Sequence, residues 1–159
     1  MNSTPEAFVR PARLDDHETL VSFNCLLAEE SEGKRLDPAR VRSGVRAILD
    51  DPAKGRYFVV ERGGRVVACL LLTWEYSDWR FGMFWWIQSV YTAAEARGQG
   101  MFGMLHEHVR GLAKADERVC GLRLYVEREN HRARKTYEHR GMRPTGYLVY
   151  EEEFEGTAE

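Results

Sequence analysis

Hydrophobic and polar positions along the chain follow two periods, one typical of strands and one typical of helices. Short apolar or alternating runs predict strands at residues 8–10, 56–61, 65–74, 83–91, 119–126 and 147–154. Apolar residues spaced three and four apart predict helices that begin near residues 16, 38, 101 and 130. One strand, two helices, a hairpin and then a strand, helix and strand in succession predict an α+β fold around a mixed sheet.

Turn and cap residues mark the ends of several of these segments. Asp37 before Pro38 is typical of an N-cap with proline at the first helical position. Gly63 and Gly64 between two strand-like runs predict a hairpin turn, and Gly141 predicts a helix end. No repeat, low-complexity tract or linker interrupts the chain, so we expect one domain over residues 1–159.

Composition narrows the class of protein. A hydrophobic content of 43% and a charged content of 30% over 159 residues are typical of a globular protein and exclude a disordered or membrane one. A net charge of -2 gives no general electrostatic reason to bind nucleic acid. Residues 1–7 lack the basic and apolar regions of a signal peptide, so we expect a cytoplasmic protein.

The three cysteines, Cys25, Cys69 and Cys120, predict neither a disulfide framework nor a zinc site. Their number is odd, no two have Cys-x-x-Cys spacing, and each lies in an apolar run where buried thiols are common. We therefore expect no metal.

The most informative stretch is the place where the strand at 83–91 leads into a glycine-rich turn that opens a helix. Gly98 and Gly100 have no β-carbon to keep a ligand away from the backbone. The first N–H groups of a helix lack intrahelical acceptors, and the positive helix end attracts anions. Arg97 adds a cation beside these donors. The stretch predicts a phosphate cradle; the alternative is a helix start with incidental glycines.

Gly98, Gly100 and Gly103 also match the glycine spacing of a dinucleotide-binding turn. In a dinucleotide fold the first glycine follows its strand directly, and a parallel strand precedes the acidic ribose ligand. Here residues 92–97 intervene, and Asp116, the nearest acid at the right offset, precedes the next strand. The context therefore argues against a dinucleotide site.

Two segments together carry a resemblance to a known family. They are Ser89-Val90-Tyr91-Thr92 through Arg97-Gly98-Gln99-Gly100, and Asn130, Ala133, Tyr137 and Gly141-Met142. At this separation they resemble the GNAT superfamily of acetyl-CoA-dependent N-acetyltransferases, over nearly the whole chain. The resemblance implies α/β/α layers: a mixed, mostly antiparallel central sheet of six to seven strands, two of them splayed at the centre, flanked by four helices. One position departs, because Phe102 stands where the family usually has glycine or alanine.

The resemblance implies acetyl-CoA as co-substrate, bound largely by main-chain groups. The backbone of Val90 and Thr92 would bond the pantetheine arm, and the Val90 amide would also face the thioester oxygen, where a preorganised donor stabilises developing charge. The pyrophosphate would be held by Arg97, Gly98, Gln99, Gly100, Met101 and Phe102. Tyr137 and Asn130 complete the cofactor-binding set, although Asn130 could equally be the N-cap of its helix.

The expected acetyl transfer needs a general acid and a general base, and the sequence offers one candidate for the acid and several for the base. Tyr137 matches the family's general acid, which protonates the departing thiolate; the alternative is a core tyrosine on an amphipathic helix. Glu29 or Glu30, at the end of the first helix, is the candidate base that takes a proton from the amine. Further candidates are Glu75, Asp78 and a water held by Gln88. For each carboxylate, a solvated surface position is the alternative.

All four tryptophans lie between residues 74 and 86. Alternation along a strand sends Trp85 and Trp86 to opposite sheet faces, so one packs in the core and the other walls an acceptor pocket or a dimer interface. The predicted acceptor pocket consists of Glu30, Tyr76, Trp86 and Gln88.

These observations predict an N-acetyltransferase that moves an acetyl group from acetyl-CoA to a primary amine by direct attack in a ternary complex. The acceptor is a small molecule or a peptide; nucleic acid and membrane are not expected partners, and a homodimer is compatible with the sequence. One alternative is a non-catalytic acyl-CoA-binding module that senses or regulates. Another is a nucleic-acid-binding protein that uses the basic stretch at 128–143.

Overall fold

The computed structural model of the chain describes residues 6–154. The chain divides into two compact units, Met1–Leu124 and Tyr125–Glu159. The N-terminal residues on which the expected localisation rests lie mostly outside the described part. Within that part, no helix has both the length and the apolar character needed to cross a lipid bilayer.

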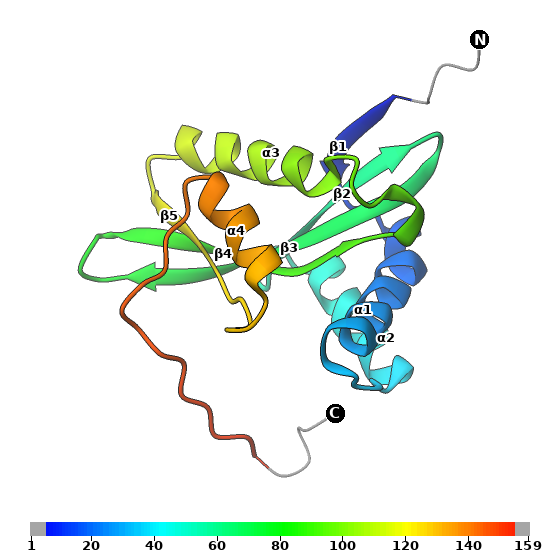
Figure 1. Cartoon of the computed structure of the whole chain (residues 1–159), viewed down its shortest axis with the longest axis horizontal. Helices are drawn as coiled ribbons and strands as arrows, with labels where there is room; N and C mark the ends of the chain where they lie inside the picture. Colours follow the sequence, from blue (N-terminus) through cyan, green and yellow to red (C-terminus); the bar gives the residue numbers. More distant parts are fainter. Residues whose placement is uncertain (1–5, 155–159) are drawn as a thin grey trace. The chain divides into compact units, whose positions relative to one another are not determined.

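The first unit is built on a mixed sheet with the strand order β1-β2-β3-β4-β5 (Figure 1). The strands are β1 (Ala7–Pro11), β2 (Arg56–Arg62), β3 (Arg65–Ser77), β4 (Gly82–Thr92) and β5 (Val119–Leu124). Every neighbouring pair is antiparallel except β4 and β5, which run parallel. The expected mixed, mostly antiparallel sheet is therefore confirmed.

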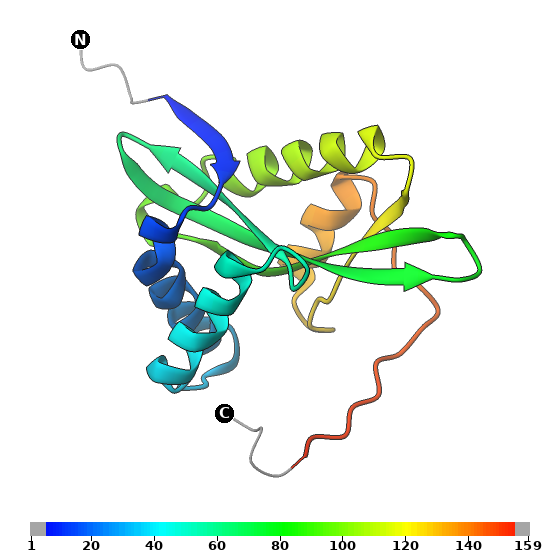
Figure 2. The same cartoon turned by 180° about the vertical axis from the view of Figure 1, so that it is seen from behind.

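Three helices of this unit cover the two faces of the sheet. They are α1 (His17–Glu32), α2 (Pro38–Asp50) and α3 (Met101–Ala115). The carboxylate of Asp37 accepts a hydrogen bond from the Ala39 N–H at 3.0 Å, and Pro38 is the first residue of α2, as the sequence predicts. Helices α1 and α2 lie on one face and α3 lies on the other (Figures 1 and 2).

A separate apolar core fills the space on each side of the sheet. On the α3 side, Phe58, Leu70 and Ile87 of the strands are buried together with Leu105 and Val109 of the helix. On the other side the core consists of Leu20, Val21, Phe23, Val45, Tyr57, Val59, Cys69, Leu71, Tyr91 and Ala93. The two cores fix β3 and β4 from both faces, so the ends of these strands are held on a rigid support.

The second unit contains α4 (His131–His139). The side chain of Asn130 accepts a hydrogen bond from the Ala133 N–H at 3.0 Å, which confirms its interpretation as the helix N-cap. Gly141 follows the helix with a φ of 85°, a backbone conformation that favours glycine.

The number of strands is lower than expected. The sheet has five strands rather than six to seven, and residues 147–154, which the apolar pattern predicts to be a strand, belong to no strand. A strand is defined by main-chain hydrogen bonds to a neighbour. Within residues 6–154 no neighbouring strand pairs with this segment.

Candidate functional site

β4 is longer than the parallel strand β5 beside it, so only part of β4 is paired with β5. β4 pairs with β5 from Met83 to Ile87, and the remaining part of β4, from Gln88 to Thr92, pairs with β3 alone. Within residues 6–154, no strand pairs with the second main-chain edge of β4 over this part, which is where the sequence predicts a ligand-binding edge. The pairing ends because β5 itself ends at Leu124, so the expected splay of two central strands stays a prediction.

An irregularity in β4 coincides with the start of this open edge. Ser89 has a φ of 49°, and the register with β3 shifts between Cys69 and Leu71, so β4 carries a bulge here. The Cys69 thiol donates to the Ser89 carbonyl oxygen, with a Sγ–O distance of 3.5 Å. Because the C=O and N–H of a trans peptide point in opposite directions, the bulge directs the Val90 N–H away from Cys69.

Beyond β4, the chain reaches α3 through the glycine turn. Gly98 and Gly100 have φ values of 72° and 80°, and the space that a β-carbon would occupy at either residue is open. The first hydrogen bond of α3 runs from the Met104 N–H to the Gly100 carbonyl, at 3.1 Å. The N–H groups of the first turn of α3 therefore have no acceptor within the helix and need acceptors from outside it.

Arg97 holds this turn against two other elements. Its Nε donates to the Thr92 carbonyl at 3.0 Å, and its Nη2 lies 2.5 Å from Oε2 of Glu30, on α1. The guanidinium also lies over the Tyr91 ring, 5.5 Å from the ring centroid. The pKa of Arg97 is raised, mainly by the hydrogen bond to Glu30. Arg97 is thus an anchor between β4, α1 and the turn.

The side chains that flank the turn point away from it in different ways. Gln99 bonds Arg62 Nη1 through its oxygen and the Glu95 carbonyl through its nitrogen, which leaves its main chain on the exposed turn. Met101 is buried in the core. The Phe102 ring lies against His106 one helical turn later, with ring centroids 5.8 Å apart. The bulky residue at position 102 is therefore accommodated along the helix.

Two of the predicted pocket residues share one sheet face. Trp86 and Gln88 lie opposite Thr73 and Leu71 in the register, on the face that carries α1 and α2. Gln88 Nε2 donates to Thr73 Oγ1 at 2.6 Å. Tyr76 lies two residues after Trp74 and therefore on the same sheet face, which is the face that carries α3. The structure thus does not bring Tyr76 together with Trp86 and Gln88.

The sequence analysis did not identify a polar cluster beside Trp86. Trp86 Nε1 donates to Glu75 Oε2 at 3.2 Å, and Arg123 on β5 forms an ion pair with the other oxygen of Glu75. The same guanidinium stacks on the Phe84 ring, 3.6 Å from its centroid. Only the parallel pairing of β4 with β5 brings position 123 beside position 86, and no local sequence signal carries that information.

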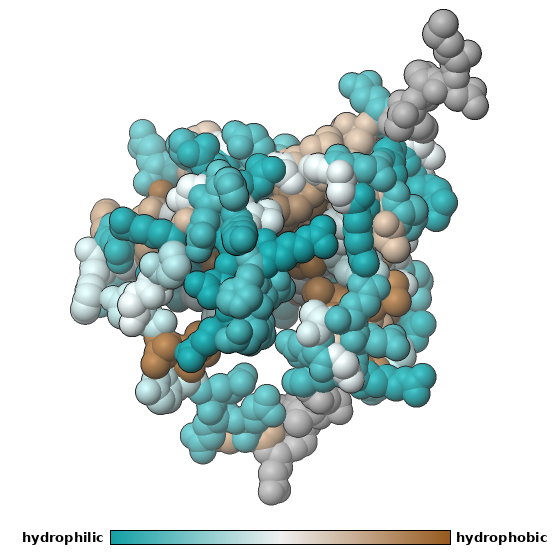
Figure 3. Space-filling view, in the orientation of Figure 1, coloured by the Kyte–Doolittle hydropathy of each residue, from teal (hydrophilic) through white to brown (hydrophobic). Residues whose placement is uncertain are grey.

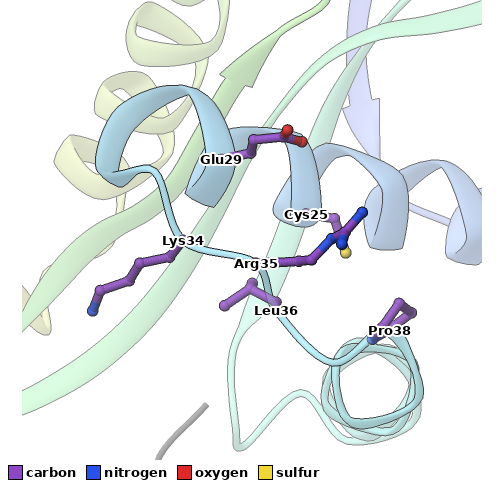
Figure 4. A pocket seen from close by; sticks show the side chains of 6 residues that line it. All are labelled: Cys25, Glu29, Lys34, Arg35, Leu36 and Pro38. Carbon is purple, nitrogen blue, oxygen red and sulfur yellow. The ribbon is translucent and has the colours of Figure 1, made fainter.

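The two candidate bases at the end of α1 have different surroundings. Glu30 accepts hydrogen bonds from the Tyr91 hydroxyl, at 3.1 Å, and from Arg97. Glu29 lies beside a cavity of about 200 Å³ between α1 and the loop that leads to α2. Figure 4 shows its lining, in which Arg35 extends towards Cys25 and Lys34 extends away; the lining residues are Cys25, Glu29, Lys34, Arg35, Leu36 and Pro38.

Two other named groups have shifted pKa values. Burial raises the pKa of the Tyr137 hydroxyl on α4. Burial also raises the pKa of the Cys69 thiol to about 12, so this thiol is protonated near neutral pH.

Asp78, another candidate base, accepts a hydrogen bond from the Trp79 N–H in the turn between β3 and β4. Residues 6–154 contain no group of three or more His, Cys, Asp or Glu side chains able to hold a metal ion.

Comparison with known proteins places these features in a family. The model of the acetyltransferase (GNAT) family matches residues 20–142, which is most of the chain. This chain belongs to the GNAT acetyltransferase family. The predicted family is therefore confirmed, and with it the fold class.

Solved structures agree with this assignment. A possible acetyltransferase from Clostridium difficile 630 is 44% identical, with a TM-score of 0.88, and the match covers 93% of this chain and 97% of the other. A predicted acetyltransferase from Clostridium acetobutylicum, solved with acetyl-CoA, shares the fold at 17% identity and a TM-score of 0.73, over 92% and 96% of the two chains. A ribosomal-protein-alanine N-acetyltransferase from Brucella melitensis biovar Abortus 2308 does so at 18% identity and a TM-score of 0.72, over 94% and 99%. No curated protein sequence matches the chain.

Proposed function

We propose that this GNAT protein is an N-acetyltransferase that binds acetyl-CoA and passes the acetyl group directly to a primary amine. The observation that carries the proposal is the continuity of the open β4 edge, Gln88–Thr92, with the left-handed glycine turn at the start of α3. An unpaired strand edge can bond the amide groups of a pantetheine arm, and exposed main-chain donors at a helix start can bind a pyrophosphate. The chain offers both within fifteen residues of one another.

The residues around the turn fit coenzyme A. The open space at Gly98 and Gly100 lets a diphosphate approach the main chain, and the Phe102 ring is turned along α3. Arg97 supplies a cation, and its pair with Glu30 is half exposed, so the guanidinium can exchange this partner for phosphate at little cost. The acetyl-CoA in the structure of the C. acetobutylicum protein, which has the same fold, supports this ligand.

The chain's own groups supply the parts of an acyl transfer to an amine. The Val90 N–H, turned away from Cys69 by the bulge at Ser89, would stabilise negative charge that develops on the thioester oxygen. Tyr137 would protonate the departing thiolate, and its raised pKa keeps the phenol protonated at neutral pH. Asn130, the cap of the helix that carries Tyr137, would add a contact to coenzyme A.

The base that we assign is Glu29 rather than Glu30. A primary amine has a pKa of about 10.4 and must lose a proton before it can attack. The Glu30 carboxylate already accepts from Arg97 and Tyr91, so both of its oxygens are engaged. Glu29 is exposed, lines the cavity at the end of α1 and takes part in no ion pair among the described residues, so its carboxylate is the more available proton acceptor.

The acceptor would lie on the α1 face of β4. Trp86 and Gln88 line that face, and an indole ring favours a cationic amine. The N-acetyltransferase from Brucella has the same fold and supports nitrogen as the accepting atom. The chemical identity of the amine is a matter for direct screening, because one fold serves many acceptors.

A screen for thiol release tests the proposal. The protein is incubated with acetyl-CoA and a panel of primary amines, diamines and peptides, and free coenzyme A is measured with a thiol reagent. We expect release that depends on the amine and on the protein, together with a product heavier than the amine by one acetyl group. Tight binding of acetyl-CoA without turnover on any amine would instead favour the non-catalytic acyl-CoA-binding module.

A further inference from the structure

Two of the tryptophans that the candidate site leaves unused line a second cavity. This cavity has a volume of about 380 Å³ and lies between the sheet and the last turns of α3. Trp74 and Trp85 form part of its wall, with ring centroids 5.5 Å apart in an edge-to-face arrangement. Small-molecule sites have volumes of about 300–1,000 Å³ and mostly apolar walls. The size and the lining of this cavity are therefore those of a ligand site.

The sheet residues that line the cavity come from one face of the sheet. Trp74 lies opposite Trp85 in the register of β3 with β4, and Arg56 lies opposite Leu72 in the register of β2 with β3. Arg56 also lies two residues before Phe58, which is buried in the core on the α3 side, so both side chains are on that face. Figures 1 and 2 show the C-terminal end of α3 over the β3–β4 hairpin. The sheet thus supplies one wall of the cavity and α3 supplies the opposite wall.

The apolar base of the cavity is rigid before any ligand binds. Trp74 Nε1 donates to the Pro52 carbonyl at 3.1 Å, which ties this ring to the loop before β2. Phe58 and Leu72, which also line the cavity, are only 2% and 1% exposed, whereas Leu112 of α3 is 39% exposed. The cavity is therefore open to solvent beside α3.

An apolar ligand gains more contact in this cavity than on a typical part of the surface. Most of the surface in Figure 3 is hydrophilic, and its apolar residues form small separate patches. Indole rings offer a large apolar area, and aromatic rings in edge-to-face or offset contact gain more than their buried area alone provides. The paired rings of Trp74 and Trp85 therefore favour a ligand with an aromatic ring.

Within the described part of the chain, the charged groups of the cavity leave one cation, Arg56, unpaired. Arg118 Nε and Nη2 donate to the two carboxylate oxygens of Asp116, at 2.9 and 2.8 Å. These hydrogen bonds lower the pKa of Asp116 to about 2, so both groups are charged at neutral pH and their charges cancel. The Arg56 side chain forms no hydrogen bond or ion pair with residues 6–154. A guanidinium binds a carboxylate through two parallel N–H···O bonds, so the cavity favours a ligand with one carboxylate.

We propose that this cavity binds a small aromatic carboxylate, with the ring against Trp74 and Trp85 and the carboxylate on Arg56. An aliphatic acid would lose the ring contacts with the two indoles. A neutral or cationic ligand would leave the Arg56 guanidinium without a partner, and a cation would also be repelled by it.

The cavity lies apart from the acetyl-CoA site proposed above. The glycine turn precedes Met101, whereas Leu112 lies near the other end of α3, ~16 Å away along the helix axis. Met83, in the cavity lining, lies at the start of β4, whereas the open edge of this strand begins at Gln88. We therefore expect both ligands to bind one chain at the same time. None of the residues proposed for acetyl transfer takes part, so this inference and the proposed function can fail separately.

Calorimetric titration with 2-naphthoate tests the site. We expect one site per chain and at least about tenfold weaker binding of 2-naphthamide, which has the same ring system but no charge. Arg56→Gln should bring the two compounds to similar, weak affinity. The matched control is Arg110→Gln, which removes the same charge from α3 outside the cavity lining and should keep the 2-naphthoate affinity within about a factor of two. Equal losses in the two variants, or no binding of 2-naphthoate to the wild type, would overturn the proposal.

A second variant fills the cavity from the helix side. Leu112→Trp enlarges a side chain that is 39% exposed, so the circular dichroism spectrum should not change. The affinity for 2-naphthoate should fall at least about tenfold, because the added ring occupies the space of the ligand. Saturating coenzyme A should leave the wild-type affinity within about a factor of two, as expected of uncoupled sites.

Two further results would assign the cavity or the probe differently. Competition between coenzyme A and 2-naphthoate would place the probe in the acetyl-CoA site. A wild-type dimer of the 18.4 kDa chain in light scattering that Leu112→Trp converts to a monomer would assign the cavity to a second copy of the chain. Either result would overturn the proposal. A chain that binds 2-naphthoate as described but no coenzyme A would contradict only the proposed function.

Discussion

Arg97 and Glu30 lie 67 positions apart in sequence and form an ion pair of 2.5 Å. Glu30 also accepts from Tyr91, and Arg97 also donates to Thr92. One contact therefore links the end of α1, the end of β4 and the turn that leads to α3. In the proposed function, the acceptor amine and the thioester meet near these three places, so before the cofactor binds this pair holds them together.

The two glutamates at the end of α1 should respond differently to loss of charge. Glu29→Gln removes the proposed proton acceptor, and we expect kcat/KM at pH 7 to fall by about 100-fold, in the range of general base catalysis. Glu30→Gln keeps the hydrogen-bonding shape and should lower kcat by less than about fivefold, since it loses only an exposed ion pair. Steady-state kinetics at saturating acetyl-CoA measures both. The reverse ranking would make Glu30 the base.

Tyr137→Phe tests the proposed acid. Removing the hydroxyl should lower kcat by about 100-fold and leave the Kd for coenzyme A within a factor of two, because the general acid acts on the leaving thiolate. Burial raises the Tyr137 pKa, so the acid form persists above the ordinary phenol value of about 10 and wild-type activity should not decline up to that pH. Full turnover by the Phe variant would remove Tyr137 from the mechanism.

Because of Asp16, the stability of the first unit should depend on pH. Burial raises the pKa of Asp16, but hydrogen bonds from the Arg10 side chain and the Arg13 N–H outweigh it and leave the pKa lowered. A lowered folded-state pKa means that the stabilisation is present above the unfolded value of about 3.9 and is lost as the pH falls through the folded value.

Chemical denaturation of an Asp16 variant checks this prediction. Asp16→Asn should lower the free energy of unfolding at pH 7 by about 1–3 kcal/mol, because a buried charged hydrogen bond to Arg10 is lost. The control is Asp15→Asn, an exposed neighbour, which should change it by less than about 0.5 kcal/mol. Equal effects of the two substitutions at pH 7 would show that the Arg10 contact is not what stabilises the fold.

Cys69 should be inert in the folded protein. With its pKa raised to about 12 by burial, the thiolate is a very small fraction at pH 8, so Cys69 should not react with a thiol reagent until the protein unfolds. Cys25 and Cys120 are at least partly exposed and should react first. Mass spectrometry after timed labelling identifies the sites. Rapid native labelling of Cys69, or a stable acetyl group on any cysteine during turnover, would argue against direct transfer.

Local signals were enough to predict most elements. Asp37-Pro38 and Asn130 cap helices as predicted, and Gly63 and Gly64, with φ values of 58° and 75°, form the hairpin turn. These features depend on residue types that favour one backbone conformation. The family and its fold could also be inferred, because two motifs stand at the expected separation.

Long-range and strained features could not be predicted in the same way. Nothing in a serine requires a positive φ, so the bulge at Ser89 is visible only in the pairing of β4 with β3. The contacts of Arg97 with Glu30 and of Arg123 with Glu75 join distant segments. Strand-like residues 147–154 have the right propensity, but a strand also needs a neighbour, and propensity alone cannot supply one.

Calorimetric titration with coenzyme A tests the central claim most directly. Gly98→Ala and Gly100→Ala place a β-carbon at positions with positive φ and fill the space where the diphosphate would approach. Gly111→Ala on α3 is the matched control, because its β-carbon also meets open space but its φ is ordinary. We predict one site per chain in the wild type and in Gly111→Ala, with affinity at least about tenfold weaker in the other two variants, a loss of about 1.4 kcal/mol. Equal affinity in all four proteins, or no binding to the wild type, would contradict the account.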